Sequence, residues 1–487
     1  MCKVGIITFI RMSLVLVAVC VICGVGVDAP ARASHNQTTF FEAPHDLLNP
    51  KTRPSVVAEM RHLGVKAIRV ELHWHDVAPA ANSAKRPNFD ATSPESYAWG
   101  EYDPLLAEAR RLGLRVLLTV TSPVPRWATS DLKAPYVTRP SDLDFRQFMT
   151  AVGKHYGREV SLYAIWNEPN ISGWLRPQFD ANGTPASPRI YRGLFEAGYE
   201  GLKAAGLSGP KVLMGETAPF GSDTVNVRQE GAGALLGEVA PLAFLRQSLC
   251  LNSHYRMSNT CAELPIYGYA HHPYTHPSRG VLYRPPEKDQ VTIGTLWRLS
   301  SALDAAARAH AIPRRVPIYL TEFGIQSKPN VLGVSRQAQA EDDAIAEKVA
   351  WSNPRVASFS QYLMHDDPLS GSIATGGGGA FVGFQTGLET QKGVRKPIYY
   401  EFPLPLVVSR NRHGYSLWGL VRPAQGVTRV RVLVEPRGSK RYRYLKMVQT
   451  GPNGYWTLRS PVSGSRWRVS WRSPSGVLYD GPSTTAS

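Results

Sequence analysis

The chain has 487 residues, of which 19% are charged and 43% hydrophobic, so it is long enough for one large core or two unequal ones. This composition excludes a disordered chain and a collagen-like repeat. The formal net charge is +17, and it is unevenly spread: residues 406–487 contain 14 Lys and Arg against only Glu435 and Asp480. The basic character therefore belongs to the C-terminal segment and indicates an accessory surface.

The N-terminus has the pattern of a secretory signal peptide. Lys3 and Arg11 precede an uncharged apolar run over residues 12–27, and a small-x-small triplet ends at Ala33. We expect residues 1–33 to be cleaved, leaving a secreted or extracellular protein, cell-wall or membrane associated at most, without stable membrane insertion. An uncleaved anchor is the alternative, although the run is shorter than the roughly 20 residues that span a bilayer.

The mature chain would keep two cysteines, Cys250 and Cys261, because the other three lie within the predicted signal peptide. In an oxidising compartment, two thiols this close in sequence favour a local disulfide. A metal site would need more soft ligands.

Between residues 39 and 400, short β-branched or apolar runs alternate with longer segments of helical spacing. Eight such units fit a (β/α)8 TIM barrel, which we assign to a catalytic domain over residues 34–405. A doubly wound sheet is the alternative, but no Gly-rich turn follows the first strand. The predicted strands are 39–44, 67–74, 115–121, 162–166, 212–216, 266–271, 318–321 and 358–363, and the predicted helices include 53–63, 103–112, 142–156, 190–205, 296–309 and 338–351.

Residues 406–487 form strand-like runs separated by turn signals, after a boundary at Pro403-Leu404-Pro405. They predict a small all-β, β-sandwich-like accessory domain. Arginines recur at every second position in several runs, so one face of a sheet should be basic while the other covers a core. These arginines are Arg429, Arg431, Arg441, Arg443, Arg466, Arg468 and Arg472.

Two glutamates follow predicted barrel strands. Glu168 lies in Trp-Asn-Glu-Pro-Asn (166–170) after the fourth strand, and Glu322 lies in Thr-Glu-Phe-Gly (321–324) after the seventh. The C-terminal ends of barrel strands form the active site of this fold. Two carboxyl groups across one cleft are what glycoside hydrolysis requires, at about 5–5.5 Å for retention of configuration.

These two motifs resemble the signatures of clan A retaining glycoside hydrolases, especially families 39 and 5, which are cellulase-like and β-xylosidase-like TIM barrels. The resemblance covers about residues 39–402, including the second strand with Arg69 and Trp74, and the third loop with Trp127. It implies hydrolysis of β-glycosidic bonds in an oligo- or polysaccharide, without cofactor or metal. The C-terminal domain lies outside it.

The resemblance also implies roles for individual residues. Glu168 would be the general acid/base and Glu322 the nucleophile, with Asn167 bonded to the sugar 2-hydroxyl. Arg69 would lie beside Glu322 and keep it ionised, giving Glu322 a low pKa, whereas the pKa of Glu168 should be raised. Glu216, after the fifth strand, would be an orienting residue. The expected substrate-binding residues are completed by His272, Tyr274, Trp74, Trp127, Tyr362 and His365, the last two because the clan's tryptophan after the eighth strand is missing here.

Two other functions compete with this interpretation. A metal-dependent barrel hydrolase could use His73-x-His75, with further ligands from His271, His272, His276 and Asp366. Both glutamate motifs would then have no role in the reaction. A catalytically inactive barrel that binds carbohydrate or the cell wall is the other.

The basic C-terminal domain favours an anionic polysaccharide or cell-wall polymer as partner, bound electrostatically and released by salt. Its interleaved arginines and aromatic residues could also suit nucleic acid. Export argues against that partner, so we expect none.

Overall fold

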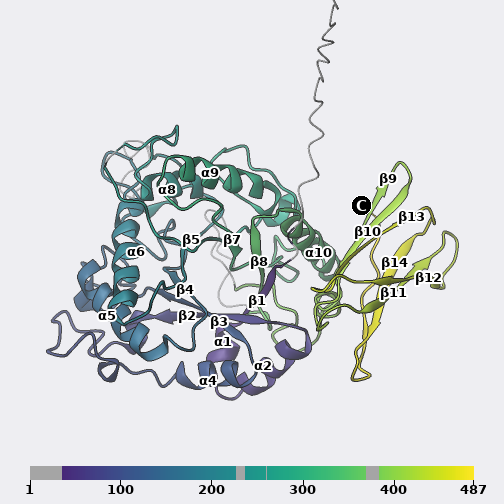
Figure 1. Ribbon diagram of the computed structural model, residues 1–487, viewed down its shortest axis with the longest axis horizontal. Coiled ribbons are helices and arrows are strands. Elements are labelled where there is room, and N and C mark those ends of the chain that lie inside the picture. The colour runs from purple at the N-terminus through teal and green to yellow at the C-terminus, as the bar shows by residue number, and fades with distance from the viewer. Residues whose placement is uncertain (1–33, 35, 226–235, 259, 369–382, 487) are drawn as a thin grey trace, which may run out of the picture. The chain divides into compact units, whose positions relative to one another are not determined.

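The computed structural model describes residues 34, 36–225, 236–258, 260–368 and 383–486, and the predicted signal peptide lies outside these ranges. Eight parallel strands close a barrel in the order β1 to β8 (Figure 1). This confirms the predicted TIM barrel. The strands are β1 (Thr38–Glu42), β2 (Ala67–His73), β3 (Arg115–Thr121), β4 (Leu162–Ile165), β5 (Val212–Thr217), β6 (Gly268–His271), β7 (Ile318–Leu320) and β8 (Val356–Tyr362).

The longer helices lie where the sequence predicts them. They are α2 (Arg53–His62), α4 (Asp103–Arg111), α5 (Asp142–Tyr156), α6 (Ser187–Ala204), α9 (Leu296–Arg308) and α10 (Arg336–Ser352). The additional helices are α1 (Pro44–Leu48), α3 (Trp74–Val77), α8 (Pro241–Ser248) and α11 (Pro397–Glu401), each too short for a helical period to show in the sequence. Within the described ranges, no helix combines the length and the apolar character that crossing a membrane requires.

Alternating side chains along the strands build two layers of core. One set fills the barrel interior with residues such as Phe40, Ala67 and Leu117. Their sequence neighbours, including Phe41 and Ile68, pack outward into the larger core beneath the helices. On β2, this two-residue period places Arg69, Glu71 and His73 on the same side as Ala67, along the inside of the barrel.

The C-terminal segment forms two antiparallel sheets that share one core, which confirms the predicted all-β domain. One sheet has the order β13-β10-β9 and the other β12-β11-β14-β15. Tyr415 from the first sheet contacts Trp467 from the second, with ring centroids 4.8 Å apart. The strands are β9 (Leu406–Asn411), β10 (Gly414–Leu420), β11 (Arg429–Glu435), β12 (Arg443–Gln449), β13 (Tyr455–Ser460), β14 (Arg466–Arg472) and β15 (Leu478–Asp480).

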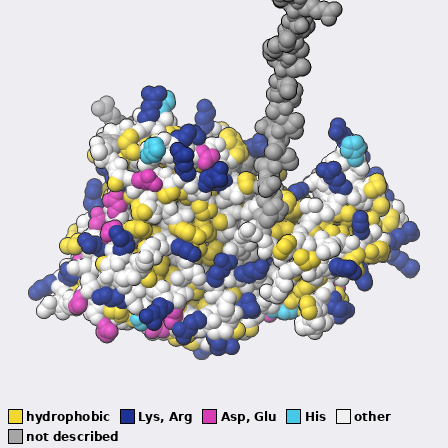
Figure 2. Space-filling model, in the orientation of Figure 1, with side chains coloured by type: hydrophobic (Ala, Val, Ile, Leu, Met, Phe, Trp, Pro, Cys, Tyr) yellow, Lys and Arg dark blue, Asp and Glu magenta, His cyan; other side chains and the backbone are white. Residues whose placement is uncertain are grey.

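The second of these sheets has the predicted basic face. On β11 the arginines 429 and 431 are exposed, whereas the valines between and after them are buried. β14 alternates in the same way around Trp467, Val469 and Trp471. Two of the predicted arginines do not belong to this face, because Arg441 lies before β12 and Arg443 pairs with the buried Val434, on the other side of the sheet. In Figure 2 the surface of the C-terminal strands shows many Lys and Arg side chains and few acidic ones.

Helix α10 of the barrel packs against the C-terminal sheets (Figure 1). Ala344 of α10 packs in a small apolar cluster with Val407 and Trp418. Beside it, the guanidinium of Arg422 donates to both carboxylate oxygens of Glu347, at 3.0 and 2.7 Å, and both side chains are almost fully buried.

Arg422→Met should lower the free energy of unfolding by about 3–5 kcal/mol, because it leaves the Glu347 carboxylate buried without its cation. Urea denaturation of the full chain measures this, with the exposed Arg412→Met as control. A loss below about 1 kcal/mol would show that this ion pair does not stabilise the junction.

Candidate active site

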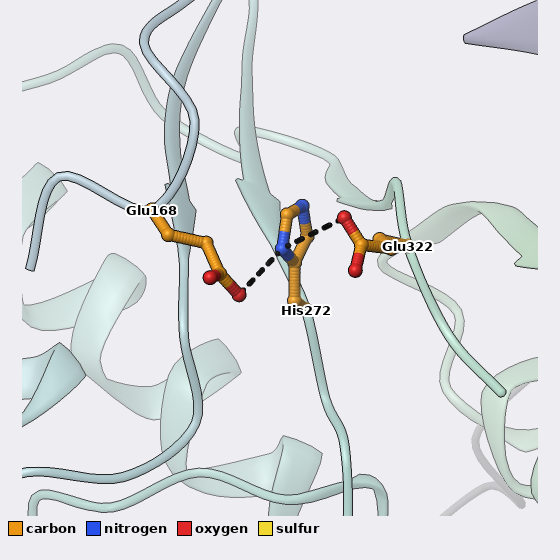
Figure 3. Close-up of side chains that lie close together, drawn as sticks. All are labelled: Glu168, His272 and Glu322. Carbon is orange, nitrogen blue, oxygen red and sulfur yellow. Dashed lines mark hydrogen bonds and ion pairs between the residues drawn. The ribbon is translucent and has the colours of Figure 1, made fainter. Parts of the chain in front are cut away.

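Glu168 and Glu322 meet at the C-terminal end of the barrel, as their strands require. Glu168 follows β4 and Glu322 follows β7. His272 lies between them, with its Nδ1 3.0 Å from Oε1 of Glu168 and 3.6 Å from Oε2 of Glu322 (Figure 3). One carboxyl oxygen of each glutamate and a nitrogen of His272 all lie within 4.8 Å of one another. The two carboxyl groups therefore face one small volume.

The backbone at this end of the barrel adopts left-handed conformations that non-glycine residues rarely take. The φ angle is 70° at Trp166, 36° at Glu168 and 48° at Glu216. The backbone N–H of Glu168 donates to the carbonyl oxygen of Glu216 at 3.0 Å, so two of these turns fix each other. Such conformations cost about 1–3 kcal/mol each and persist where the surrounding structure enforces them, often at functional sites.

Arg69 organises the carboxyl groups beneath the pair. Its side chain is fully buried, and its Nε and Nη2 donate to the two carboxylate oxygens of Glu216 at 3.0 and 2.7 Å. Nη1 donates to Glu42 at 2.6 Å and to Glu322 at 3.3 Å. Nη2 also donates to Oδ1 of Asn167 at 2.7 Å. Glu216 is completely buried and bonded in this way, which fits the orienting role expected of it.

Glu322 is held from two sides. The Tyr274 hydroxyl donates to its Oε1 at 2.6 Å, and Arg69 binds its Oε2. Burial nevertheless raises the pKa of Glu322 above its ordinary value, although His272 and Arg69 lower it in part. This corrects the expectation of a low pKa, because the cost of removing the carboxylate from water exceeds the stabilisation that Arg69 and His272 provide.

Glu168 has a strongly shifted carboxyl group. Burial raises its pKa to about 8, with Arg69 opposing the shift and Glu71 adding to it. The group therefore carries a proton at neutral pH while a second carboxyl lies close by. Paired carboxyl groups in such different environments are characteristic of acid/base catalysis.

The remaining predicted substrate-binding residues differ in their burial and in their hydrogen-bond partners. Tyr362 is half-buried at the end of β8, where burial and the nearby Glu322 raise its pKa well above the ordinary value. His365 is bound by Asp46 at 3.0 Å and Glu389 at 3.4 Å. Trp127 donates its Nε1 to the Pro79 carbonyl at 3.0 Å and meets the edge of Trp74.

Trp74 requires a correction. It is fully buried, and its ring stacks on Phe148 with centroids 5.2 Å apart. A side chain enclosed in the core cannot stack on a sugar, so Trp74 supports the packing of α5 against β2. The cause is the two-residue period of β2, which places Arg69, Glu71 and His73 inside the barrel and therefore directs the next side chain, Trp74, outward into the core.

The histidines proposed for a metal site do not gather. His73 is hydrogen-bonded through Nδ1 to the carbonyl of Ser122. His271 is hydrogen-bonded through its two ring nitrogens to the Thr217 hydroxyl and the Val291 carbonyl. Asp366 is paired with Lys396. In the described part of the chain, the one group close enough to bind a metal ion is Glu168, His272 and Glu322. The metal interpretation thus loses its ligand set, and the remaining cluster is the carboxyl pair itself.

Three residues near the site were not anticipated from the sequence. Glu42 ends β1, and burial raises its pKa well above the ordinary value. Glu71 shares a strand face with Arg69, a two-residue period that could have revealed it. Trp174 lies in the loop after β4 and stacks on His73, with centroids 6.1 Å apart and planes at 8°.

Cys250 and Cys261 form the expected disulfide, with a Cα–Cα distance of 6.3 Å.

Known structures share this architecture. A family 39 glycoside hydrolase from Bacteroides cellulosilyticus WH2 aligns with 15% identity over 91% of this chain and 81% of its own, at a TM-score of 0.51. A glucosidase from Croceicoccus marinus aligns with 13% identity over 90% and 95%, at a TM-score of 0.50. No protein-family model and no curated protein matches the sequence. At these identities the likeness shows the fold.

Proposed function

We propose that this protein is a secreted retaining glycoside hydrolase that cleaves β-glycosidic bonds of an oligo- or polysaccharide. The observation that carries the proposal is the pair Glu168 and Glu322 at the C-terminal end of a TIM barrel, with carboxyl oxygens within 4.8 Å of each other. This spacing suits the double-displacement mechanism, for which the carboxyl groups lie about 5–5.5 Å apart, better than inversion, for which they lie about 6.5–9.5 Å apart. The shared fold of a family 39 glycoside hydrolase and a glucosidase supports the same conclusion.

The chemistry follows from the different states of the two carboxyl groups. Protonated Glu168 gives its proton to the glycosidic oxygen as the bond from that oxygen to the anomeric carbon breaks, and ionised Glu322 forms an ester to the same carbon. Glu168, now ionised, takes a proton from water, whose oxygen displaces Glu322. The sugar leaves with its original anomeric configuration, and both glutamates return to their starting states.

Asn167 is oriented for a contact with the substrate. Its Oδ1 accepts a hydrogen bond from Arg69, which leaves the Nδ2 hydrogens to donate. A donor beside the pair suits the 2-hydroxyl of the sugar, where hydrogen bonds strengthen in the transition state. Tyr274 orients Glu322 for attack through its 2.6 Å hydrogen bond.

Secretion and polymer binding complete the proposal. The signal-like residues 1–33 and the Cys250–Cys261 disulfide support export into an oxidising compartment. The exposed arginines of β11 and β14 lie on one face of their sheet, which supports binding of an anionic polysaccharide such as a cell-wall polymer.

Glu322→Gln should lower kcat/KM for aryl β-glycosides by about 10,000-fold or more, because the nucleophile is lost while the amide keeps the shape. Glu168→Gln should lower it by about 100- to 10,000-fold, and more steeply for poor leaving groups that need protonation. A panel of aryl β-glycosides measures both effects, with Glu108→Gln on the exposed face of α4 as control. Full activity of Glu322→Gln would refute the assignment.

The pH profile of kcat/KM should be bell-shaped. Activity should fall as pH rises through about 8, where Glu168 loses the proton that it must donate. It should also fall as pH drops through the raised pKa of Glu322, because the protonated carboxyl cannot attack. Initial rates from pH 4 to 10 measure this. The residual activity of Glu168→Gln should no longer fall as pH rises through about 8. If it still falls there, the fall in the unmodified protein cannot be assigned to Glu168.

Replacing Arg429, Arg431, Arg466 and Arg468 together by Ser should abolish retention of the protein on dextran sulfate at low salt. Hydrolysis of small aryl glycosides should not change. The matched control replaces four exposed arginines of the barrel, Arg61, Arg158, Arg308 and Arg314, and should keep its retention. Equal losses in both variants would show that net charge, and not this face, binds the polymer.

A further inference from the structure

Carboxyl groups dominate the charge around the proposed catalytic pair. Among the described residues, Arg69 contacts Glu42, Glu71, Glu216 and Glu322. The charged groups that most affect Glu168 are Arg69 on one side and Glu71, Glu238 and Glu216 on the other. Four carboxyl groups of the protein thus surround one guanidinium.

Arg69 is not placed to bind a substrate anion. Its side chain is 0% exposed, and its Nε, Nη1 and Nη2 all donate to carboxyl groups of the protein. His272 is also fully buried, and burial lowers its pKa, so the ring is neutral at neutral pH. Arg69, the cation beside the pair, is therefore committed to carboxyl groups of the protein.

Of the four carboxyl groups that contact Arg69, Glu71 is the one that the mechanism does not use and that remains partly exposed. Its side chain is 11% exposed, one oxygen lies 3.3 Å from Nη2 of Arg69, and the other lies 3.8 Å from Nε2 of His73. His73 is in turn stacked with the half-buried ring of Trp174. A carboxylate, an imidazole and an indole thus form a continuous patch that begins at Arg69.

We infer that Glu71, His73 and Trp174 form a sugar-binding subsite that accepts uncharged glycosides and rejects hexuronides. The carboxylate of Glu71 accepts hydrogen bonds from sugar hydroxyls, and the indole of Trp174 covers an apolar face of the ring. A hexuronide would bring a further carboxylate into a poorly solvated volume that already holds an excess of negative charge, where like charges repel strongly. The inference rests on the proposed function and specifies its substrate class.

The test compares substrates that differ only at C6, the aryl β-glucoside with the β-glucuronide and the β-galactoside with the β-galacturonide. The unmodified protein should prefer the neutral member of an accepted pair by about 100-fold or more in kcat/KM. Glu71→Gln should narrow that preference by about 10-fold, because it removes a charge and keeps the shape. Glu108→Gln should leave it unchanged.

Binding provides a readout that does not need turnover. Phenyl 1-thio-β-glucoside and phenyl 1-thio-β-glucuronide resist hydrolysis, and calorimetry with the unmodified protein should detect tighter binding of the neutral ligand. Trp174→Ala should weaken that binding while Glu71→Gln should improve binding of the uronide.

The outcomes separate this inference from the proposed function. Hydrolysis of both members of a pair at similar rates would refute the subsite and leave the glycosidase standing. Absence of hydrolysis across the panel, with selective binding of the neutral thioglycoside, would refute the enzyme and leave the subsite standing. Binding of both thioglycosides with equal affinity, or of neither at millimolar concentration, would refute the subsite.

Discussion

Arg69 is a guanidinium fully withdrawn from water, and the end of the barrel is built around the carboxyl groups that compensate it. The groups come from β1, β2, β5 and the segment after β7, and the amide of Asn167 joins them from the segment after β4. Burying such a cation is costly unless each donor is paired with good geometry. The network therefore fixes the mutual positions of segments that are far apart in the sequence, and with them the positions of Glu168 and Glu322.

The same burial explains why the two glutamates differ. Both are desolvated, which raises their pKa values, but the carboxyl group of Glu322 is additionally bound by Arg69 and by the Tyr274 hydroxyl, whereas His272 lies near both glutamates. Glu168 has Arg69 only as a more distant cation and lies among other carboxylates. The two side chains are chemically identical, but Glu168 holds its proton whereas the better stabilised Glu322 can ionise.

Much of the fold could be predicted from the sequence because each strand of the barrel is a short apolar run bounded by turn residues. Glu168 and Glu322 stood out because each follows such a run in a distinctive motif, and the structure brings both to one place. The burial of Trp74 follows from the two-residue period of β2, which turns Arg69, Glu71 and His73 into the barrel and the next side chain outward into the core. Glu42 and Trp174 were missed because their relation to Arg69 and His73 exists only once the barrel has closed, whereas Glu71 was overlooked although it lies two residues from Arg69 on β2.

The most direct test of the account is covalent trapping of the intermediate. A 2,4-dinitrophenyl 2-deoxy-2-fluoro-β-glycoside of the preferred sugar should inactivate the protein with one glycosyl group per chain, because the fluorine slows hydrolysis of the ester more than its formation. Peptide mass spectrometry should locate that group on Glu322. A group attached to another residue, or turnover of the unmodified substrate with inversion and no adduct, would contradict the double-displacement mechanism proposed for this pair.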